Sequence, residues 1–78
     1  MLWLNIDLAT SVWKLHDENC IYCKPEESLN KGIDEMGRNG GWFSFKSYFE
    51  AQEFFEKEGK NQIWQPCKVC HPEKQARN

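Results

Sequence analysis

Residues 67–72 read CKVCHP, and residues 20–25 read CIYCKP in the same pattern. A C-x-x-C turn directs two thiolates at one point, and zinc takes four such ligands in a tetrahedron at about 2.3 Å from each sulfur. The two pairs use all four cysteines of the chain. The pattern therefore predicts one structural Zn²⁺ ion per chain, with the ligands Cys20, Cys23, Cys67 and Cys70.

His16 offers an alternative fourth ligand. It stands four residues before Cys20, and a His-x-x-x-Cys spacing also lets two side chains chelate one ion. The equal spacing within the two cysteine pairs favours Cys23, with His16 as the alternative in its place. We expect His71, directly after Cys70, to lie beside the site rather than in it.

The length of 78 residues allows one domain, which we place at residues 1–72, followed by a flexible tail at residues 73–78. A core of this size rarely contributes more than about 3–5 kcal/mol. A structural zinc contributes about 10–16 kcal/mol in finger peptides.

The stretch between the cysteine pairs is longer than the roughly 15–20 residues of compact four-cysteine fingers. It must therefore be a folded insert.

Two runs near the N-terminus alternate between apolar and polar residues, at Leu4–Leu8 and at Val12–His16. This period of two is typical of half-buried strands, and the short break between the runs predicts a β-hairpin. The aromatic run Trp42–Phe45 predicts one further short strand.

Two helices are predicted inside the insert. The first would start at Pro25 and place Leu29, Ile33 and Met36 on one face. The second starts with the capping box S-x-x-E at residues 47–50 and runs to about Glu58, with its apolar side formed by Tyr48, Ala51, Phe54 and Phe55. The predicted class is α+β: a small zinc-stabilised domain with an N-terminal hairpin, one further strand and two helices between two C-x-x-C knuckles.

The net charge is −2 and the sequence pI is near 5.6. This acidic balance favours a protein as the binding partner over a nucleic acid. The nucleic-acid alternative rests on Lys68 and Lys74 with Trp64 near them.

No run approaches the 18 or so apolar residues of a membrane span, and no leader is recognisable. We expect a cytoplasmic monomer without a membrane partner. In the reducing cytoplasm, C-x-x-C pairs more often bind metals than form disulfides.

Three motifs in order resemble one known family. They are LHxxxC at residues 15–20, FSFxSxxxA at residues 43–51 and WQPCKVCHP at residues 64–72. Together they resemble the zinc-binding domain of the Ada DNA-repair protein and related small domains appended to nucleases. In that family the first ligand pair is spaced C-x-x-x-C or H-x-x-x-C. The resemblance therefore implies His16 and Cys20 as the first pair, Cys67 and Cys70 as the second, and Cys23 as an extra thiol.

The same resemblance bears on chemistry. In the Ada domain the first cysteine, bound to zinc, accepts a methyl group from a DNA phosphotriester. The matching residue here is His16, which cannot act as that nucleophile. We therefore expect a module without enzymatic activity that binds a protein or a nucleic acid. The alternatives are an Ada-like alkyl acceptor and a thiol–disulfide redox protein, which needs a C-x-x-C thiol of lowered pKa and leaves the second pair unexplained.

Overall fold

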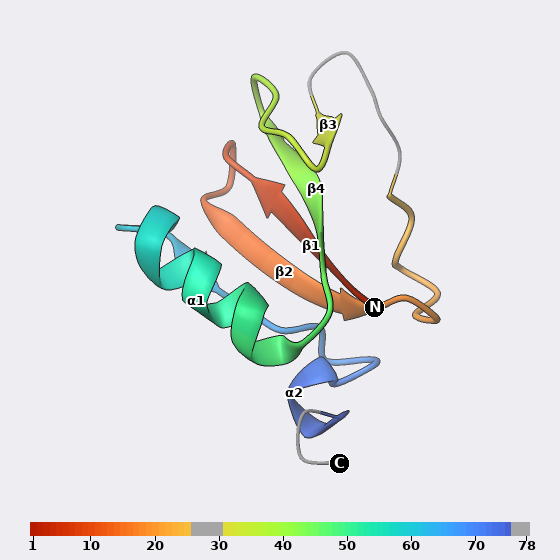
Figure 1. The fold of residues 1–78 in the computed structure, drawn as a ribbon. Coiled ribbons are helices and arrows are strands. Elements are labelled where there is room, and N and C mark those ends of the chain that lie inside the picture. Colours follow the sequence, from red (N-terminus) through yellow and green to blue (C-terminus); the bar gives the residue numbers. More distant parts are fainter. Residues whose placement is uncertain (26–30, 76–78) are drawn as a thin grey trace.

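The computed structural model describes residues 1–25 and 31–75, and within them five strands form one mixed sheet in the order β3-β4-β1-β2-β5 (Figure 1). The strands are β1 (Leu2–Asp7), β2 (Val12–Asp17), β3 (Gly32–Ile33), β4 (Gly40–Phe45) and β5 (Ile63–Trp64). The helices are α1 (Tyr48–Glu58) and α2 (Pro72–Gln75). The α+β class is confirmed.

The central strands β1 and β2 form where the sequence alternates. They pair antiparallel, with Leu4 opposite Leu15 and Ile6 opposite Trp13. All four side chains lie on one face of the sheet and are almost completely buried. On the other side of β1, β4 pairs antiparallel with it. The apolar half of each alternation thus builds one wall of the core.

Helix α1 covers this apolar face of the sheet (Figure 1). One half of the predicted capping box forms at its first turn: the Glu50 amide donates to Ser47 Oγ at 3.2 Å. The Glu50 carboxylate accepts instead from the amide of Lys46, one residue before the N-cap, at 3.1 Å. The helix ends at Glu58, and the Gly59 amide bonds the Phe55 carbonyl. Ala51 is fully buried, and Phe54 and Phe55 flank Trp13, with ring centroids 5.6 and 5.2 Å from it.

The first predicted helix is wrong where the structure describes it. Residues 26–30 lie outside the described residues, and residues 31–36 contain the short strand β3 and a bend instead of a helix. Gly32 pairs with Gly41 in parallel, and a Cβ on Gly32 would lie 2.4 Å from Glu35 Cγ. Asp34 has a left-handed backbone and accepts from the Ser44 amide and hydroxyl at 2.8 and 2.9 Å. Pairing with β4 therefore overrides the helical spacing of the apolar residues.

The sequence predicted one strand beyond the first two, and the described residues contain three, β3, β4 and β5. Both β3 and β5 are two residues long, too short to show an alternating pattern. Helix α2 follows the second C-x-x-C pair and includes residues 73–75 of the predicted tail. Among the described residues, α1 is therefore the one helix between the cysteine pairs. None of the described helices has the length and apolar character needed to cross a membrane.

Candidate metal centre

Strand β2 brings the two halves of the site together. His16 lies in β2, and Cys20 follows three residues after its end. The chain after β5 continues to run beside β2: the Gln65 amide donates to the Trp13 carbonyl at 2.9 Å, and the Cys67 amide donates to the Leu15 carbonyl at 2.8 Å. Strand pairing thus delivers the second C-x-x-C turn to the residues that follow β2.

Four potential metal ligands converge at this point. One ligand atom from each of His16, Cys20, Cys67 and Cys70 lies within 4.8 Å of every other. The sulfurs of Cys20 and Cys67 are 3.8 Å apart. A tetrahedron with metal–sulfur bonds of about 2.3 Å has edges of about 3.8 Å. The separation of these two sulfurs therefore fits a shared tetrahedral ion.

The imidazole of His16 gives independent evidence for a ligand. The residue is 3 % exposed, and its Nδ1 is buried without a hydrogen-bond partner. Leaving such an atom unsatisfied costs about 1–3 kcal/mol. Burial, and next the charge of Lys14, lower the pKa of His16 below its usual value. A neutral imidazole with an unsatisfied nitrogen beside three thiols fits a metal ion.

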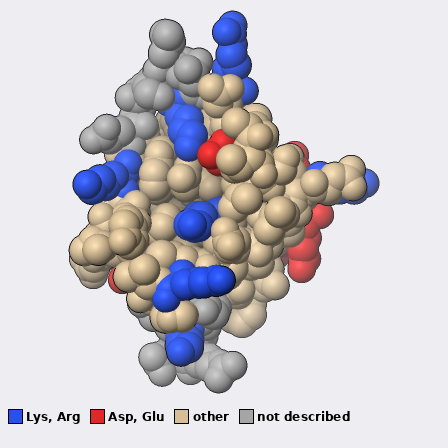
Figure 2. All heavy atoms as spheres, turned by 180° about the vertical axis from the view of Figure 1, so that it is seen from behind, with Lys and Arg blue, Asp and Glu red and all other residues tan. Residues whose placement is uncertain are grey.

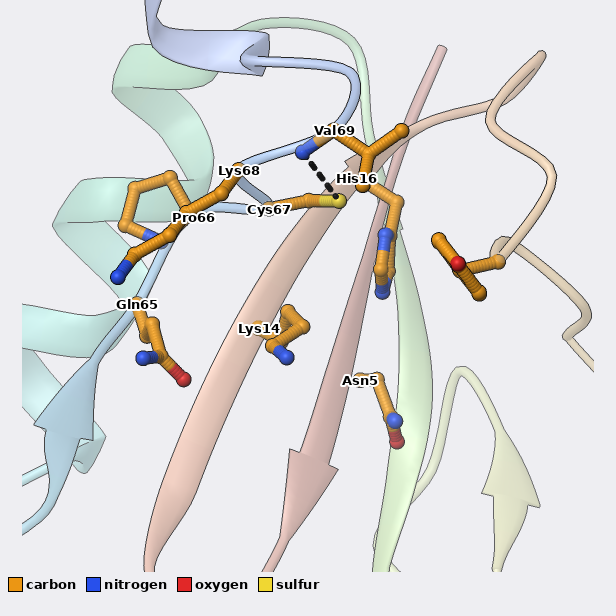
Figure 3. A pocket seen from close by; sticks show the side chains of 9 residues that line it. Asn5, Lys14, His16, Gln65, Pro66, Cys67, Lys68 and Val69 are labelled. Carbon is orange, nitrogen blue, oxygen red and sulfur yellow. Dashed lines mark hydrogen bonds between the residues drawn. The ribbon is translucent and has the colours of Figure 1, made fainter.

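Backbone amides point at two of the sulfurs. The Asp17 amide lies 3.2 Å from Cys70 Sγ, and the Val69 amide lies 3.4 Å from Cys67 Sγ, as the dashed line in Figure 3 shows. An amide donor stabilises a thiolate more than a neutral thiol. These bonds therefore prepare the two sulfurs for the deprotonated form in which cysteine binds metals.

The thiols respond differently to this environment. Burial acts to raise the pKa of Cys67, but hydrogen bonds from the Cys70 and Val69 amides and with the neighbouring thiols bring it below its usual value. Burial raises the pKa of Cys70 to about 12, against the opposing effect of the Asp17 amide. A cation among these sulfurs would reverse the penalty of burying negative charge.

Cys23 lies outside the described cluster. It is half-buried, and its amide bonds the Cys20 carbonyl at 2.9 Å in the expected turn, but its sulfur is not grouped with the others. Burial, and then the charges of Cys20 and Asp17, raise its pKa to about 11. The structure thus places His16, and not Cys23, with the three other cysteines, and His71 is likewise not in the group. This is the arrangement that the family resemblance implied and that spacing alone disfavoured.

A pocket of about 400 Å³ lies directly beside the cluster. Cys67 and His16 line the part of it nearest the cluster, and Asn5, Lys14 and Gln65 line it farther along the sheet (Figure 3). Sequence reasoning did not select these three polar residues. The sequence pattern indicated only that Asn5 and Lys14, as polar residues between apolar ones in β1 and β2, would lie on the face of the sheet opposite the core.

The chain matches no family model, no curated protein and no solved structure. The resemblance to the Ada-type domain accordingly rests on the three motifs of the sequence.

Proposed function

We propose that this chain is a small zinc-stabilised module without enzymatic activity that presents a surface to a binding partner. One Zn²⁺ ion is held by His16, Cys20, Cys67 and Cys70. The observation that carries the proposal is the convergence of these ligand atoms around a buried imidazole nitrogen that has no other partner.

The donor set favours zinc over other metals. Three thiolates and one imidazole form a set that structural zinc sites commonly use, and hard cations such as Mg²⁺ and Ca²⁺ prefer oxygen ligands. Four protein ligands also fill a tetrahedral site, whereas catalytic zinc keeps a position open for water or substrate. A closed site supports a structural role.

The alkyl-acceptor alternative is disfavoured by the ligand set. The first ligand of the H-x-x-x-C pair is His16, and an imidazole cannot replace the thiolate nucleophile of the Ada domain. The redox alternative needs two thiols of one C-x-x-C turn to form a disulfide. Burial raises the pKa of Cys23 to about 11, which makes the first pair a poor nucleophile near neutral pH. In the second pair the pKa of Cys67 is lowered, but the proposed site uses both Cys67 and Cys70 as zinc ligands, which leaves neither thiol free to form a disulfide.

Metal analysis and cadmium NMR test the proposal. The purified chain is expected to hold one zinc ion, and cadmium in its place should couple to the cysteine protons of Cys20, Cys67 and Cys70 and to the imidazole of His16. The matched control is Cys23→Ser, which should retain the metal and the same couplings. A folded chain that binds no metal when zinc is supplied, or a cadmium coupling to Cys23, contradicts the proposed site.

A further inference from the structure

The two faces of the sheet differ in what covers them. Leu4 and Ile6 of β1 face the core under α1, so the intervening Asn5 lies on the opposite face. Lys14 lies opposite Asn5 on β2 and therefore shares that face. Among the described elements, α1 packs on the core side only. Within the described residues, α1 thus leaves the face that carries Asn5 and Lys14 uncovered.

Two adjoining hollows lie on this face of the sheet. The pocket of about 400 Å³ beside the metal centre and a second hollow of about 280 Å³ share Asn5, Lys14 and Gln65 in their walls. We call the two together the sheet groove. The larger hollow, which we call the wider end, lies at Cys67, and the smaller one, the narrow end, lies at Asp7. Residues of β2 from Val12 to His16 line the two hollows.

Positive charge is concentrated along the sheet groove. Lys14 and Lys68 line it, and the Lys31 ammonium donates to Asn5 Oδ1 at 2.8 Å beside it. Figure 2, seen from behind the view of Figure 1, shows Lys and Arg side chains gathered over this face and few Asp or Glu. At the narrow end the carboxylate of Asp7 accepts from the Ala9 and Thr10 amides at 3.1 and 3.4 Å.

Much of the acidic charge lies elsewhere. The helix α1 exposes four carboxylates to solvent, those of Glu50, Glu53, Glu56 and Glu58. The net charge of −2 therefore conceals two surfaces of opposite sign. Because screening limits the reach of a surface charge to roughly 8–10 Å, a ligand in the groove responds to the local lysines rather than to the net charge.

The wider end adds an exposed aromatic ring. Tyr22 lines the pocket and is 59 % exposed, and Val69 beside it in the wall is equally exposed. Trp64, which the sequence had suggested as the aromatic partner of the lysines, packs elsewhere. Its ring lies 5.2 Å from Phe55, and its Nε1 donates to the Tyr48 hydroxyl at 3.3 Å.

The groove cannot bind a peptide by adding it as a strand. β1 pairs with β2 and β4, and β2 pairs with β1 and β5, so the backbone under the groove is already paired on both sides. Recognition must come from the side chains: lysines, two amides and one aromatic ring. Lysines neutralise phosphates, aromatic rings stack on bases, and the amides of Asn5 and Gln65 can both donate to and accept from base edges.

We propose that the sheet groove binds single-stranded nucleic acid, with phosphates at Lys14 and Lys68 and a base stacked on Tyr22. The proposal rests on the proposed zinc module, because the metal would fix the turn that carries Cys67 and Lys68 at the wider end. The binding partner in this proposal is a nucleic acid rather than a protein.

Fluorescence anisotropy of a labelled oligothymidylate of about ten nucleotides tests the proposal; OB folds, which are small domains that bind single strands, occupy roughly 4–16 nucleotides. The zinc-loaded full chain is titrated at about 50 and about 200 mM salt. Binding should be saturable at the lower salt and weaker at the higher. Lys14→Gln and Lys68→Gln should each weaken binding and flatten the salt dependence by roughly 0.7 in the logarithmic slope. Tyr22→Ala should weaken binding by about fivefold or more.

Lys60→Gln is the matched control, because Lys60 is exposed and does not line the groove. It should leave the affinity unchanged. Absence of binding at the lower salt, or equal weakening by Lys60→Gln and Lys14→Gln, overturns the proposal. So does tighter binding of a polyglutamate peptide that the same substitutions abolish. Zinc content and circular dichroism are measured on each protein first. A zinc-loaded, folded chain that does not bind the oligonucleotide refutes the groove proposal alone, whereas a folded chain that binds no zinc when zinc is supplied refutes the proposed module.

Discussion

The sulfurs of Cys20 and Cys67 lie 3.8 Å apart although 47 positions separate the two residues in the chain. A metal ion between them would close the long loop that contains β4 and α1. Cross-linking distant residues removes conformational entropy from the unfolded chain, and the effect grows slowly with loop length. The binding of the metal is thereby coupled to the folding of the domain.

The ligand set can be tested by two matched serine substitutions. Cys20→Ser should abolish tight zinc binding, because it removes one of the grouped thiols, whereas Cys23→Ser should leave the affinity within about threefold of the parent. Competition with a chromophoric chelator measures both affinities. Substitution with cobalt provides a second readout, since the thiolate-to-metal absorption should weaken only in Cys20→Ser. Equal losses in the two variants contradict the assigned set.

The preference for Cys23 from sequence shows what local spacing can and cannot establish. Spacing identified Cys20, Cys67 and Cys70 because a C-x-x-C turn is a local structure. The fourth position depends on which side chain points at the second turn once β2 and the chain after β5 are paired. The bond between the Cys67 amide and the Leu15 carbonyl sets Cys67 beside His16, and no local pattern encodes that contact.

The same division applies to the fold. Helix α1 was predicted with its start and end because the cap at Ser47 and the glycine after Glu58 act within one turn. The helical stripe that includes Ile33 and Met36 failed because Gly32 packs closely against Glu35 and pairs with Gly41. The pairing of Gly32 with Gly41 joins segments on either side of a turn, and a pattern of apolar residues at helical spacing does not reveal it.

Zinc affinity should fall as the pH falls, because protons compete with the metal for its ligands. Burial raises the pKa of Cys70 to about 12, so this thiol loses its proton only when metal binds. Burial lowers the pKa of His16, so its imidazole is already neutral near pH 7 and releases no proton. We expect up to three protons released per zinc, one from each grouped thiol.

Calorimetry in two buffers of different ionisation enthalpy measures this proton release. The Cys23→Ser variant is the control and should release the same number of protons as the parent. A release of four protons, reduced by one in Cys23→Ser, would show that Cys23 is a ligand after all.

The N-cap of α1 should contribute measurably to stability. Ser47→Ala removes the hydroxyl that accepts from the Glu50 amide and should lower the free energy of unfolding by about 1 kcal/mol. Ser47→Asp supplies another acceptor at the same position and should lose much less. Urea unfolding with saturating zinc measures both variants, and equal losses would mean that the cap bond does not stabilise the helix.

The core should be too small to maintain the fold when a buried side chain is truncated and the metal is removed. Leu4 is fully buried, and Leu4→Ala should cost about 2–5 kcal/mol, which is comparable to the roughly 3–5 kcal/mol that a core of this size supplies. We expect Leu4→Ala to be unfolded without zinc and folded with it, because metal binding contributes several times that cost. Circular dichroism during zinc titration measures the recovery. Ile63→Ala is the control: Ile63 is 55 % exposed, so its truncation should change stability by less than about 0.5 kcal/mol. A Leu4→Ala chain that is folded after chelation would show that the core, and not the metal, carries the stability of the domain.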